Sequence, residues 1–379
     1  MRTESRVIAC LLWTLAVGPP SSAAAESTLS GDLPRRENRV LEAIPGLDSH
    51  FDLLRTADGA RLRTILTRPA GSTGRLSAIL FVQWLSCDSI ELPEKQQDGW
   101  SRMLRRLAQE SGMVMMRTEK AGVGDSEGGA CERLDYETEL SHHRAALAAL
   151  RRSEHVDAAR IVVFGASMGG NMAPLVAAGE PLAGVMIWGG GAHSWFERML
   201  GFERRAKELS AIPAAELDAY MRSLQRFLLA YLLERKDPAT IAREQPALAG
   251  IWGRIVGTGE GSHYGRPLAF HQQAAQQDWA AAWERVDAPV LALYGEYDWF
   301  EDVAAHRLVA EIANRRASGR GELVQIAGTD HHFERFADAR AAFRGEGGVV
   351  NSDAAVDVML RWLHVQVLRG GGSPPSQSP

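Results

Sequence analysis

Residues 161–170 read Ile-Val-Val-Phe-Gly-Ala-Ser-Met-Gly-Gly, an apolar run followed at once by a serine between glycines. The first four residues are β-branched or aromatic, which is typical of a buried strand. Gly165 and Gly169 stand two residues on either side of Ser167, where a sharp strand-to-helix turn needs small residues. Such a turn raises the serine hydroxyl above the sheet and points the amides of the next helix at it. We expect Ser167 to be a nucleophile; the alternative is an inert serine in a glycine-rich turn.

Two later stretches supply an acid and a base in the order Ser, acid, His that this kind of turn requires. Residues 291–298 read Leu-Ala-Leu-Tyr-Gly-Glu-Tyr-Asp, a strand that ends in Asp298. Residues 326–333 read Ile-Ala-Gly-Thr-Asp-His-His-Phe and place His331 after the last predicted strand. We expect Asp298 to orient the imidazole of His331, which takes the serine proton. Other candidates are Glu296, Glu301 and Asp302 for the acid, and His332 for the base.

The rest of the chain alternates short apolar runs with helical patterns, which indicates a mostly parallel sheet with helices on both faces, an α/β fold. A hairpin is predicted around residues 57–60, which read Ala-Asp-Gly-Ala. The expected strands are 51–54, 62–66, 77–82, 113–116, 161–164, 182–188, 290–294 and 322–326. The expected helices are 100–110, 136–150 and a last one that starts near Ser352, a good N-cap, and ends near Leu368.

Residues 195–285 interrupt this alternation, because no strand pattern appears there. Eight apolar residues recur at helical spacing, and we expect them to pack within the segment: Leu217, Tyr220, Met221, Leu224, Phe227, Leu228, Tyr231 and Leu232. We interpret residues 195–285 as a helical cap insertion between two parts of the α/β core, 26–194 and 286–368.

The two ends of the chain are expected to lie outside this fold. Residues 1–25 have a charged start, a short apolar stretch and an Ala-Ala-Ala cleavage site, as in a signal peptide. Cleavage before Glu26 predicts a secreted or periplasmic protein. The alternative is an uncleaved membrane anchor. Lipidation at Cys10 is rejected, because that cysteine and Arg6 lie at the front of the apolar stretch, whereas a lipidation site should follow it. Residues 369–379 read RGGGSPPSQSP and predict a disordered tail.

The two cysteines that remain after removal of the signal peptide are consistent with export. Removal of the signal leaves Cys87 and Cys131, and both follow predicted strands at the same edge of the sheet. An oxidising compartment favours a disulfide between them. The alternative is two separate buried thiols.

Composition excludes several other classes of function. A formal net charge of −5 over 379 residues, without a long basic run, gives no reason to expect nucleic acid as a partner. We predict no metal and no organic cofactor, since apart from the adjacent His331 and His332 no cluster has ligand spacing. The expected partner is a small-molecule ester or amide, and no oligomeric state is indicated.

These motifs resemble the α/β-hydrolase superfamily, nearest to its serine aminopeptidase and monoglyceride-lipase-like branch of esterases. The resemblance covers roughly residues 51–368. The family pattern places the acid in a G-x-x-D stretch, matched by 295–298, and the base third after a glycine, which is His331 counted from Gly328. Residues 122–128, Gly-Val-Gly-Asp-Ser-Glu-Gly, resemble the loop after the fourth strand. Residues 264–266 and Trp283 look like cap elements of related secreted hydrolases.

The sequence departs from this family after the third strand. Where relatives carry His-Gly, this chain has Gln83-Trp84, followed by Leu85. A backbone donor survives any side chain, so the resemblance implies an oxyanion hole built from the amides of Leu85 and Met168. Trp84 in place of glycine must occupy space in or beside the acyl pocket.

The predicted activity is hydrolysis of carboxylic esters through an acyl-enzyme on Ser167. One alternative is an aminopeptidase or another amide or thioester hydrolase on the same residues. A second is a non-catalytic scaffold that binds a ligand or partner. Some of six tryptophans are expected to line the pocket: Trp84, Trp188, Trp195, Trp279, Trp283 and Trp299.

Overall fold

The computed structural model describes residues 33–36 and 41–368 of the chain. The predicted signal peptide and C-terminal tail both lie outside these residues. In the described part, no helix combines the length and the apolar character that crossing a bilayer requires.

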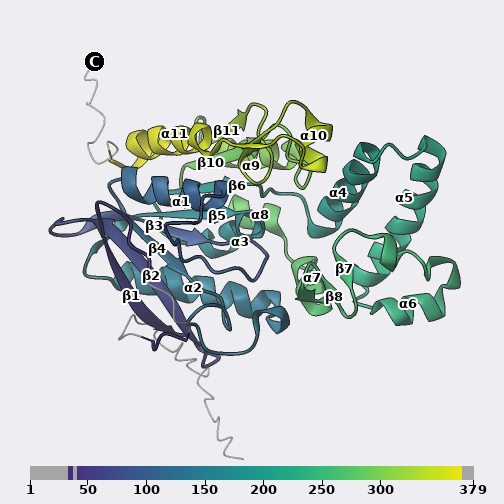
Figure 1. The fold of residues 1–379 in the computed structure, drawn as a ribbon, viewed down its shortest axis with the longest axis horizontal. Helices are drawn as coiled ribbons and strands as arrows, with labels where there is room; N and C mark the ends of the chain where they lie inside the picture. The colour runs from purple at the N-terminus through teal and green to yellow at the C-terminus, as the bar shows by residue number, and fades with distance from the viewer. Residues whose placement is uncertain (1–32, 37–40, 369–379) are drawn as a thin grey trace, which may run out of the picture.

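An eight-stranded sheet lies at the centre of the fold (Figure 1), in the order β1-β2-β4-β3-β5-β6-β10-β11. Only β2 runs antiparallel to its neighbours, and all other pairs are parallel. The strands are β1 Leu47–Arg55, β2 Arg61–Pro69, β3 Leu76–Val82, β4 Val114–Thr118, β5 Val156–Ala166, β6 Gly184–Trp188, β10 Val290–Gly295 and β11 Gly321–Ile326. The predicted fold class, α/β with a mostly parallel sheet, is confirmed.

Helices cover both faces of this sheet, and alternate residues of each inner strand enter different apolar clusters. In β3, Ile79 and Phe81 pack with α1 and α11, whereas Leu80 and Val82 pack with the helices of the opposite face. Burial on both sides explains why the inner strands are continuous apolar runs. One face is covered by α1 Gly99–Glu110 and α11 Ser352–Leu363. The opposite face is covered by α2 Tyr136–Arg152, α3 Met168–Ala177, α8 Trp279–Glu284 and α9 Val303–Arg316.

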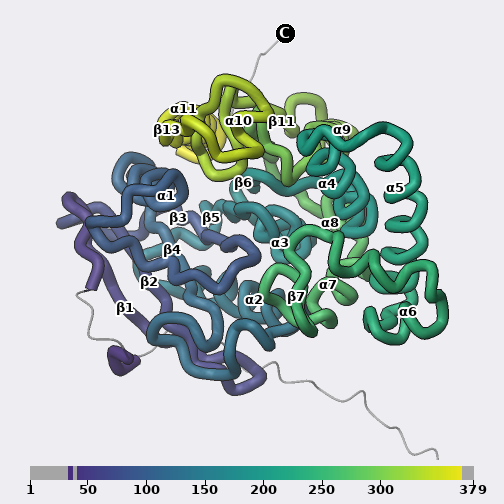
Figure 2. The backbone as a smooth tube through the Cα atoms, turned by 45° about the vertical axis from the view of Figure 1, so that its right-hand side comes forward, coloured from purple at the N-terminus to yellow at the C-terminus, as the bar shows by residue number. Residues whose placement is uncertain are grey.

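Between β6 and β10 the chain leaves the sheet and forms a separate mass of helices, which stands on the right in Figures 1 and 2. Its elements are α4 Trp195–Leu209, α5 Ala214–Leu228, α6 Pro238–Glu244, α7 Leu268–Ala274 and a small sheet of β7 Thr258–Gly259, β8 Ser262–His263 and β9 Arg266–Pro267. The apolar stripe of residues 217–232 is buried in one cluster with α4 and α7, as its helical spacing predicts.

Two details differ from the sequence-based expectations. Residues 195–285 do contain strands, because β7, β8 and β9 pair around two tight turns. Strands of two residues leave no alternating pattern that a sequence could show. The last helix begins at Ser352 and its N-cap is Asn351, so Ser352 is not the cap.

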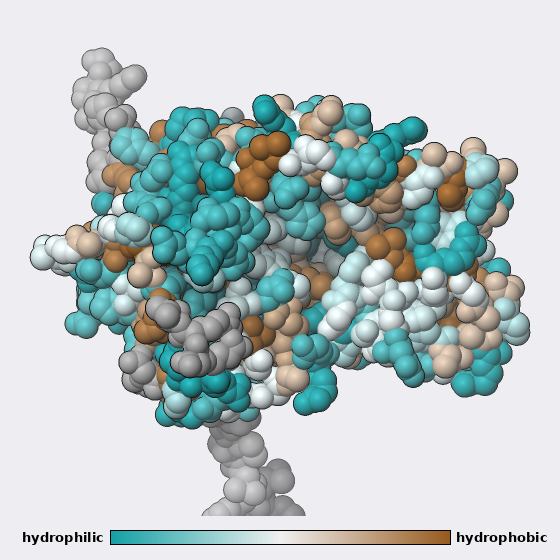
Figure 3. Space-filling model, in the orientation of Figure 1, coloured by the Kyte–Doolittle hydropathy of each residue, from teal (hydrophilic) through white to brown (hydrophobic). Residues whose placement is uncertain are grey.

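A second small sheet lies near the end of the chain. It pairs β12 Glu334–Arg335 with β13 Val349–Val350, and α10 Ala339–Arg344 lies between these two strands in the chain. The outer surface seen in Figure 3 is largely hydrophilic, with hydrophobic residues scattered over it.

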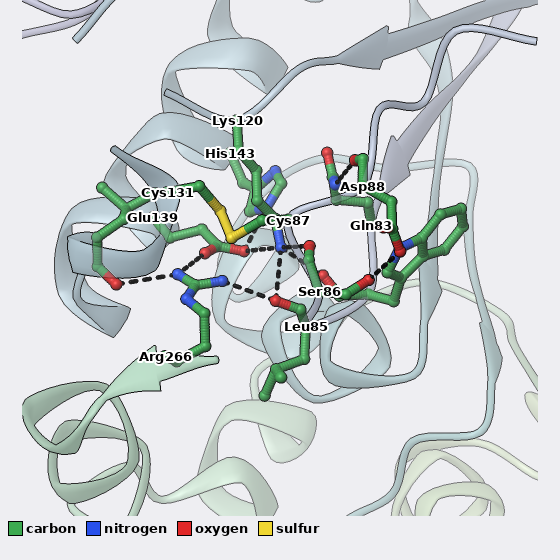
Figure 4. The surroundings of a disulfide bond; sticks show 12 residues. Gln83, Leu85, Ser86, Cys87, Asp88, Lys120, Cys131, Glu139, His143 and Arg266 are labelled. Carbon is green, nitrogen blue, oxygen red and sulfur yellow. Dashed lines mark hydrogen bonds and ion pairs between the residues drawn. A yellow bond between two sulfur atoms is a disulfide. The ribbon is translucent and has the colours of Figure 1, made fainter. Parts of the chain in front are cut away.

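The structure joins Cys87, after β3, to Cys131, the first residue of a short 3-10 helix, by a disulfide with a Cα–Cα distance of 5.8 Å (Figure 4). Cys131 is buried. The bond therefore ties the loop after β3 to the segment after β4, as the sequence predicts.

Loss of this disulfide is expected to destabilise the fold. The double variant Cys87→Ser/Cys131→Ser should have a free energy of unfolding lower by about 4 kcal/mol, since the bond closes a chain segment with a sequence separation of 44. Denaturant titration of oxidised and variant protein measures the difference. Equal midpoints, or two freely alkylated thiols in protein from an oxidising compartment, would contradict the bond.

Candidate active site

Ser167 occupies the turn between β5 and α3 in a conformation that residues with a Cβ rarely adopt. Its φ is 55° and its ψ is −123°, which costs on the order of 1–3 kcal/mol. The Ser167 amide donates to the Trp188 carbonyl at 2.7 Å, and the Gly170 amide donates to the Ser167 carbonyl at 2.8 Å. The turn is thus anchored to the neighbouring strand β6 and to its own helix.

The flanking glycines allow the chain to close on itself at this turn. A Cβ on Gly165 would lie 2.2 Å from the Gly169 carbonyl oxygen, and a Cβ on Gly169 would lie 2.0 Å from that of Val82. No side chain fits at either place. The close approach of Gly169 also brings the first turn of α3 against the end of β3.

His331 lies between Ser167 and Asp298, although these residues are far apart in the sequence. Its Nε2 is 2.9 Å from Ser167 Oγ, and its Nδ1 is 2.7 Å from Asp298 Oδ2. The Trp188 indole N–H donates to the His331 carbonyl at 3.0 Å and so fixes the loop after β11. A Cβ on Gly189 would be 2.5 Å from the imidazole, so this glycine leaves room for the ring.

Asp298 is buried and its second oxygen is also engaged. Oδ1 accepts hydrogen bonds from the amides of Phe300, at 2.9 Å, and Glu301, at 3.0 Å. Burial by itself would raise the pKa of Asp298, but the nearby His331 imidazole outweighs it and lowers the pKa. Burial in turn opposes a charged His331, and the Asp298 carboxylate outweighs this and raises the histidine pKa above its ordinary value of 6.5.

The competing acids and the second histidine are engaged elsewhere. Glu296 accepts from the Gly328 amide, Glu301 pairs with Arg198, and Asp302 caps α9 through the Ala304 amide. The His332 side chain is 52% exposed, and its Nδ1 lies 3.4 Å from Asp330. The structure therefore brings together Ser167, Asp298 and His331, the three residues that the sequence favours.

A cavity of about 780 Å³ opens beside Ser167 and His331. Three of the six predicted tryptophans line it: Trp84, Trp195 and Trp299. The other three, Trp188, Trp279 and Trp283, are buried in the apolar clusters instead.

Sequence reasoning missed several further residues of the cavity wall. The aromatic residues among them are Trp100, Tyr264, Phe300, Phe336 and Phe343. They come from α1, the turn between β8 and β9, the loop after β10 and the region of α10, where single aromatic residues carry no motif. The wall also contains the ion pair of Arg198, from α4, with Glu301, at 2.9 Å. Only the fold shows that these segments meet.

The two proposed oxyanion donors, Leu85 and Met168, line the same cavity as Ser167. Met168 is the first residue of α3, so its amide has no acceptor within the helix. The Leu85 amide likewise has no hydrogen-bond acceptor among the residues that the structure describes. Trp84 packs against Trp100, with ring centroids 5.0 Å apart, and forms part of the wall.

The remaining chemistry-bearing side chains do not gather into a metal site. Within residues 33–36 and 41–368, no group of three or more His, Cys, Asp or Glu side chains is placed to hold an ion.

Comparison with known proteins gives matches in structure alone. No protein-family model matches the sequence, and no curated protein matches it. An α/β hydrolase from Penicillium sp. sh18 is 16% identical, with a TM-score of 0.51, and the match covers 85% of this chain and 99% of that one.

Two further solved structures are similar to the same degree. An esterase from Pyrococcus furiosus is 12% identical, with a TM-score of 0.51 and coverage of 90% and 99%. A Butyrivibrio proteoclasticus protein with bound ferulic acid is 15% identical, with a TM-score of 0.52 and coverage of 84% and 100%. The sheet order, the turn at Ser167 and these structural matches agree, and the chain therefore has the α/β-hydrolase fold.

Proposed function

We propose that this protein is a secreted serine hydrolase that cleaves carboxylic esters through an acyl-enzyme on Ser167. The observation that carries the proposal is the continuous chain of contacts from Ser167 Oγ through His331 to Asp298 beside a large cavity. A nucleophile, a base in contact with it and a group that orients the base make up the arrangement on which acyl transfer depends.

The mechanism follows from these contacts. His331 Nε2 accepts the proton of Ser167 Oγ as the oxygen attacks the ester carbonyl, and Asp298 stabilises the imidazolium that forms. The amides of Leu85 and Met168 donate to the oxyanion. The alcohol leaves with the proton from His331, and water then repeats the sequence on the acyl-enzyme.

Export is part of the same proposal. The predicted signal peptide and the disulfide between Cys87 and Cys131 support it.

Replacement of the nucleophile should abolish the reaction. Ser167→Ala is expected to prevent labelling by a fluorophosphonate probe and to lower kcat by roughly 10⁴–10⁶-fold, with the fold retained. His331→Ala should lower kcat to a similar degree. His332→Ala is the matched control, because that ring is half exposed and contacts Asp330 instead. Full turnover by Ser167→Ala, or a larger loss from His332→Ala than from His331→Ala, would contradict the assignment.

The pH dependence of kcat/KM should report the pKa of His331. The base must be neutral, and Asp298 raises its pKa above 6.5, so activity should fall as the pH is lowered through that raised value. Asp298→Asn removes the carboxylate that most strongly opposes the effect of burial on the ring, so the acidic limb should move to lower pH. The variant should also lose roughly 10⁴-fold in kcat, because the imidazole is no longer held in the right tautomer. An acidic limb that Asp298→Asn leaves in place would assign it to another group.

The cavity favours esters over amino-terminal amides. An aminopeptidase needs free carboxylates to hold a substrate ammonium group, yet four of the five acids in the wall, all but Glu334, are already engaged. Asp88 accepts from the Ser86 hydroxyl. Asp98 caps α1, Glu301 pairs with Arg198, and Asp330 accepts from two backbone amides. Eight aromatic and five aliphatic side chains make up about half of the rest of the wall and suit an apolar acyl or alcohol group.

Esters with acetyl to octanoyl chains should therefore be hydrolysed with a higher kcat/KM than aminoacyl anilides. The measurement compares the two series at one pH, with Ser167→Ala as the blank. A preference of tenfold or more for an aminoacyl amide would replace the esterase assignment with the aminopeptidase alternative. Inertness toward both series would favour the non-catalytic scaffold.

A further inference from the structure

Three charged side chains are buried beside the loop that follows β3, where the Leu85 amide lies (Figure 4). Lys120 follows β4, Glu139 belongs to α2, and Arg266 begins β9 in the insertion. Their side chains are 2%, 1% and 0% exposed. Burial of a charge is costly unless it is paired and hydrogen-bonded, so the contacts of this cluster indicate what it holds in place.

Lys120 binds the loop through three successive carbonyl groups. Its Nζ donates to the oxygens of Trp84 at 2.5 Å, Leu85 at 3.1 Å and Ser86 at 2.9 Å. The same ammonium group lies 3.1 Å from Glu139 Oε1. Burial lowers the pKa of Lys120 to about 8, and the Glu139 carboxylate opposes this and favours the charged ammonium.

Arg266 contacts the same loop but a different set of atoms. Its Nη1 donates to the Leu85 carbonyl at 2.8 Å, and its Nη2 donates to the Leu134 carbonyl at 3.0 Å and to Glu139. Both cations thus share one carboxylate and the Leu85 carbonyl. Of these two cations, only Lys120 contacts the Trp84 carbonyl.

The contact with Trp84 fixes the direction of the next amide. In a planar trans peptide the C=O and the following N–H point in opposite directions, and the described residues contain no cis peptide bond. Since the Trp84 carbonyl faces Lys120, the Leu85 N–H points away from Lys120. That N–H has no acceptor in the described part of the chain, and Leu85 lines the cavity that contains Ser167.

We propose that Lys120 is a positioning residue for ester hydrolysis, because its hold on the Trp84 carbonyl turns the Leu85 amide toward the oxyanion. The inference rests on the proposed function. Lys120 is not among the residues of the cavity wall, so it acts on the reaction through the backbone of residues 84–86. Glu139 keeps the ammonium in place, and Arg266 joins the insertion to the same loop.

A purely structural role is the competing explanation, in which Lys120 only neutralises Glu139. The variants Lys120→Met and Arg266→Met separate the two roles, because each leaves Glu139 with one cation fewer. Of the two variants, only Lys120→Met releases the Trp84 carbonyl. Both variants should lower the thermal midpoint, but kcat should fall roughly 10²-fold in Lys120→Met and by a clearly smaller factor in Arg266→Met.

The loss in Lys120→Met should be confined to the transition state. KM should stay within about threefold of wild type, since the oxyanion forms only after attack. Affinity for an aryl trifluoromethyl ketone, whose serine adduct carries an oxyanion, should fall by the same factor as kcat/KM. Affinity for the carboxylic acid product should not change. The proposal would be overturned by a folded Lys120→Met whose kcat is within fivefold of wild type. It would also be overturned if the variant lost affinity for the trifluoromethyl ketone and for the acid product by the same factor.

Two further measurements test the proposal in case Lys120→Met does not fold. Lys120→Met/Glu139→Gln removes the unpaired carboxylate together with the cation, and Glu139→Gln alone is its control. Independently, the wild-type protein with a phosphonate bound to Ser167 should show the phosphonyl oxygen hydrogen-bonded to the Leu85 amide and Lys120 on the Trp84 carbonyl. A phosphonyl oxygen that does not contact Leu85 would refute the inference. Failure of wild-type Ser167 to react at all would instead refute the proposed function.

Discussion

The contact between Gly169 and the end of β3 is the constraint on which the arrangement of this site depends. No Cβ fits at Gly169, since it would lie 2.0 Å from the Val82 oxygen and 2.6 Å from that of Gln83. The first turn of α3 therefore lies directly beside the loop that continues from Gln83. As a result, Met168 and Leu85 line one cavity, although one begins a helix and the other belongs to an irregular loop.

The parallel sheet places the other partners at the same edge. Asp298 follows β10 and His331 follows β11, and the carboxyl ends of parallel strands meet on one side of a sheet. The His331 ring is then held by contacts from three directions. Asp298 binds Nδ1, the Trp188 indole fixes the backbone carbonyl, and Gly189 leaves space beside the imidazole. The strain of the Ser167 backbone is offset by packing that fixes the turn on both sides.

The loop after β3 has no regular secondary structure, so other contacts must hold it. The disulfide at Cys87 and the buried charges of Lys120, Glu139 and Arg266 act on consecutive residues of that loop. A buried ion cluster contributes little to stability when its desolvation is counted, and its value then lies in the geometry that it specifies. The positioning role proposed for Lys120 agrees with this, because its ammonium group binds three backbone carbonyls of one loop.

The sequence by itself determined the α/β fold, the inner strands and the three residues that meet at the site, Ser167, Asp298 and His331. These carry strong local signals, since a doubly buried strand must be apolar and a strained turn needs glycines at fixed spacing. The tertiary structure alone decided which tryptophans face the cavity, because burial in a core and exposure to a pocket demand the same residue type. It also decided the partners of Lys120 and the pairing of the two-residue strands β7, β8 and β9. Such contacts join residues far apart in the chain or too few to form a pattern, so no local rule encodes them.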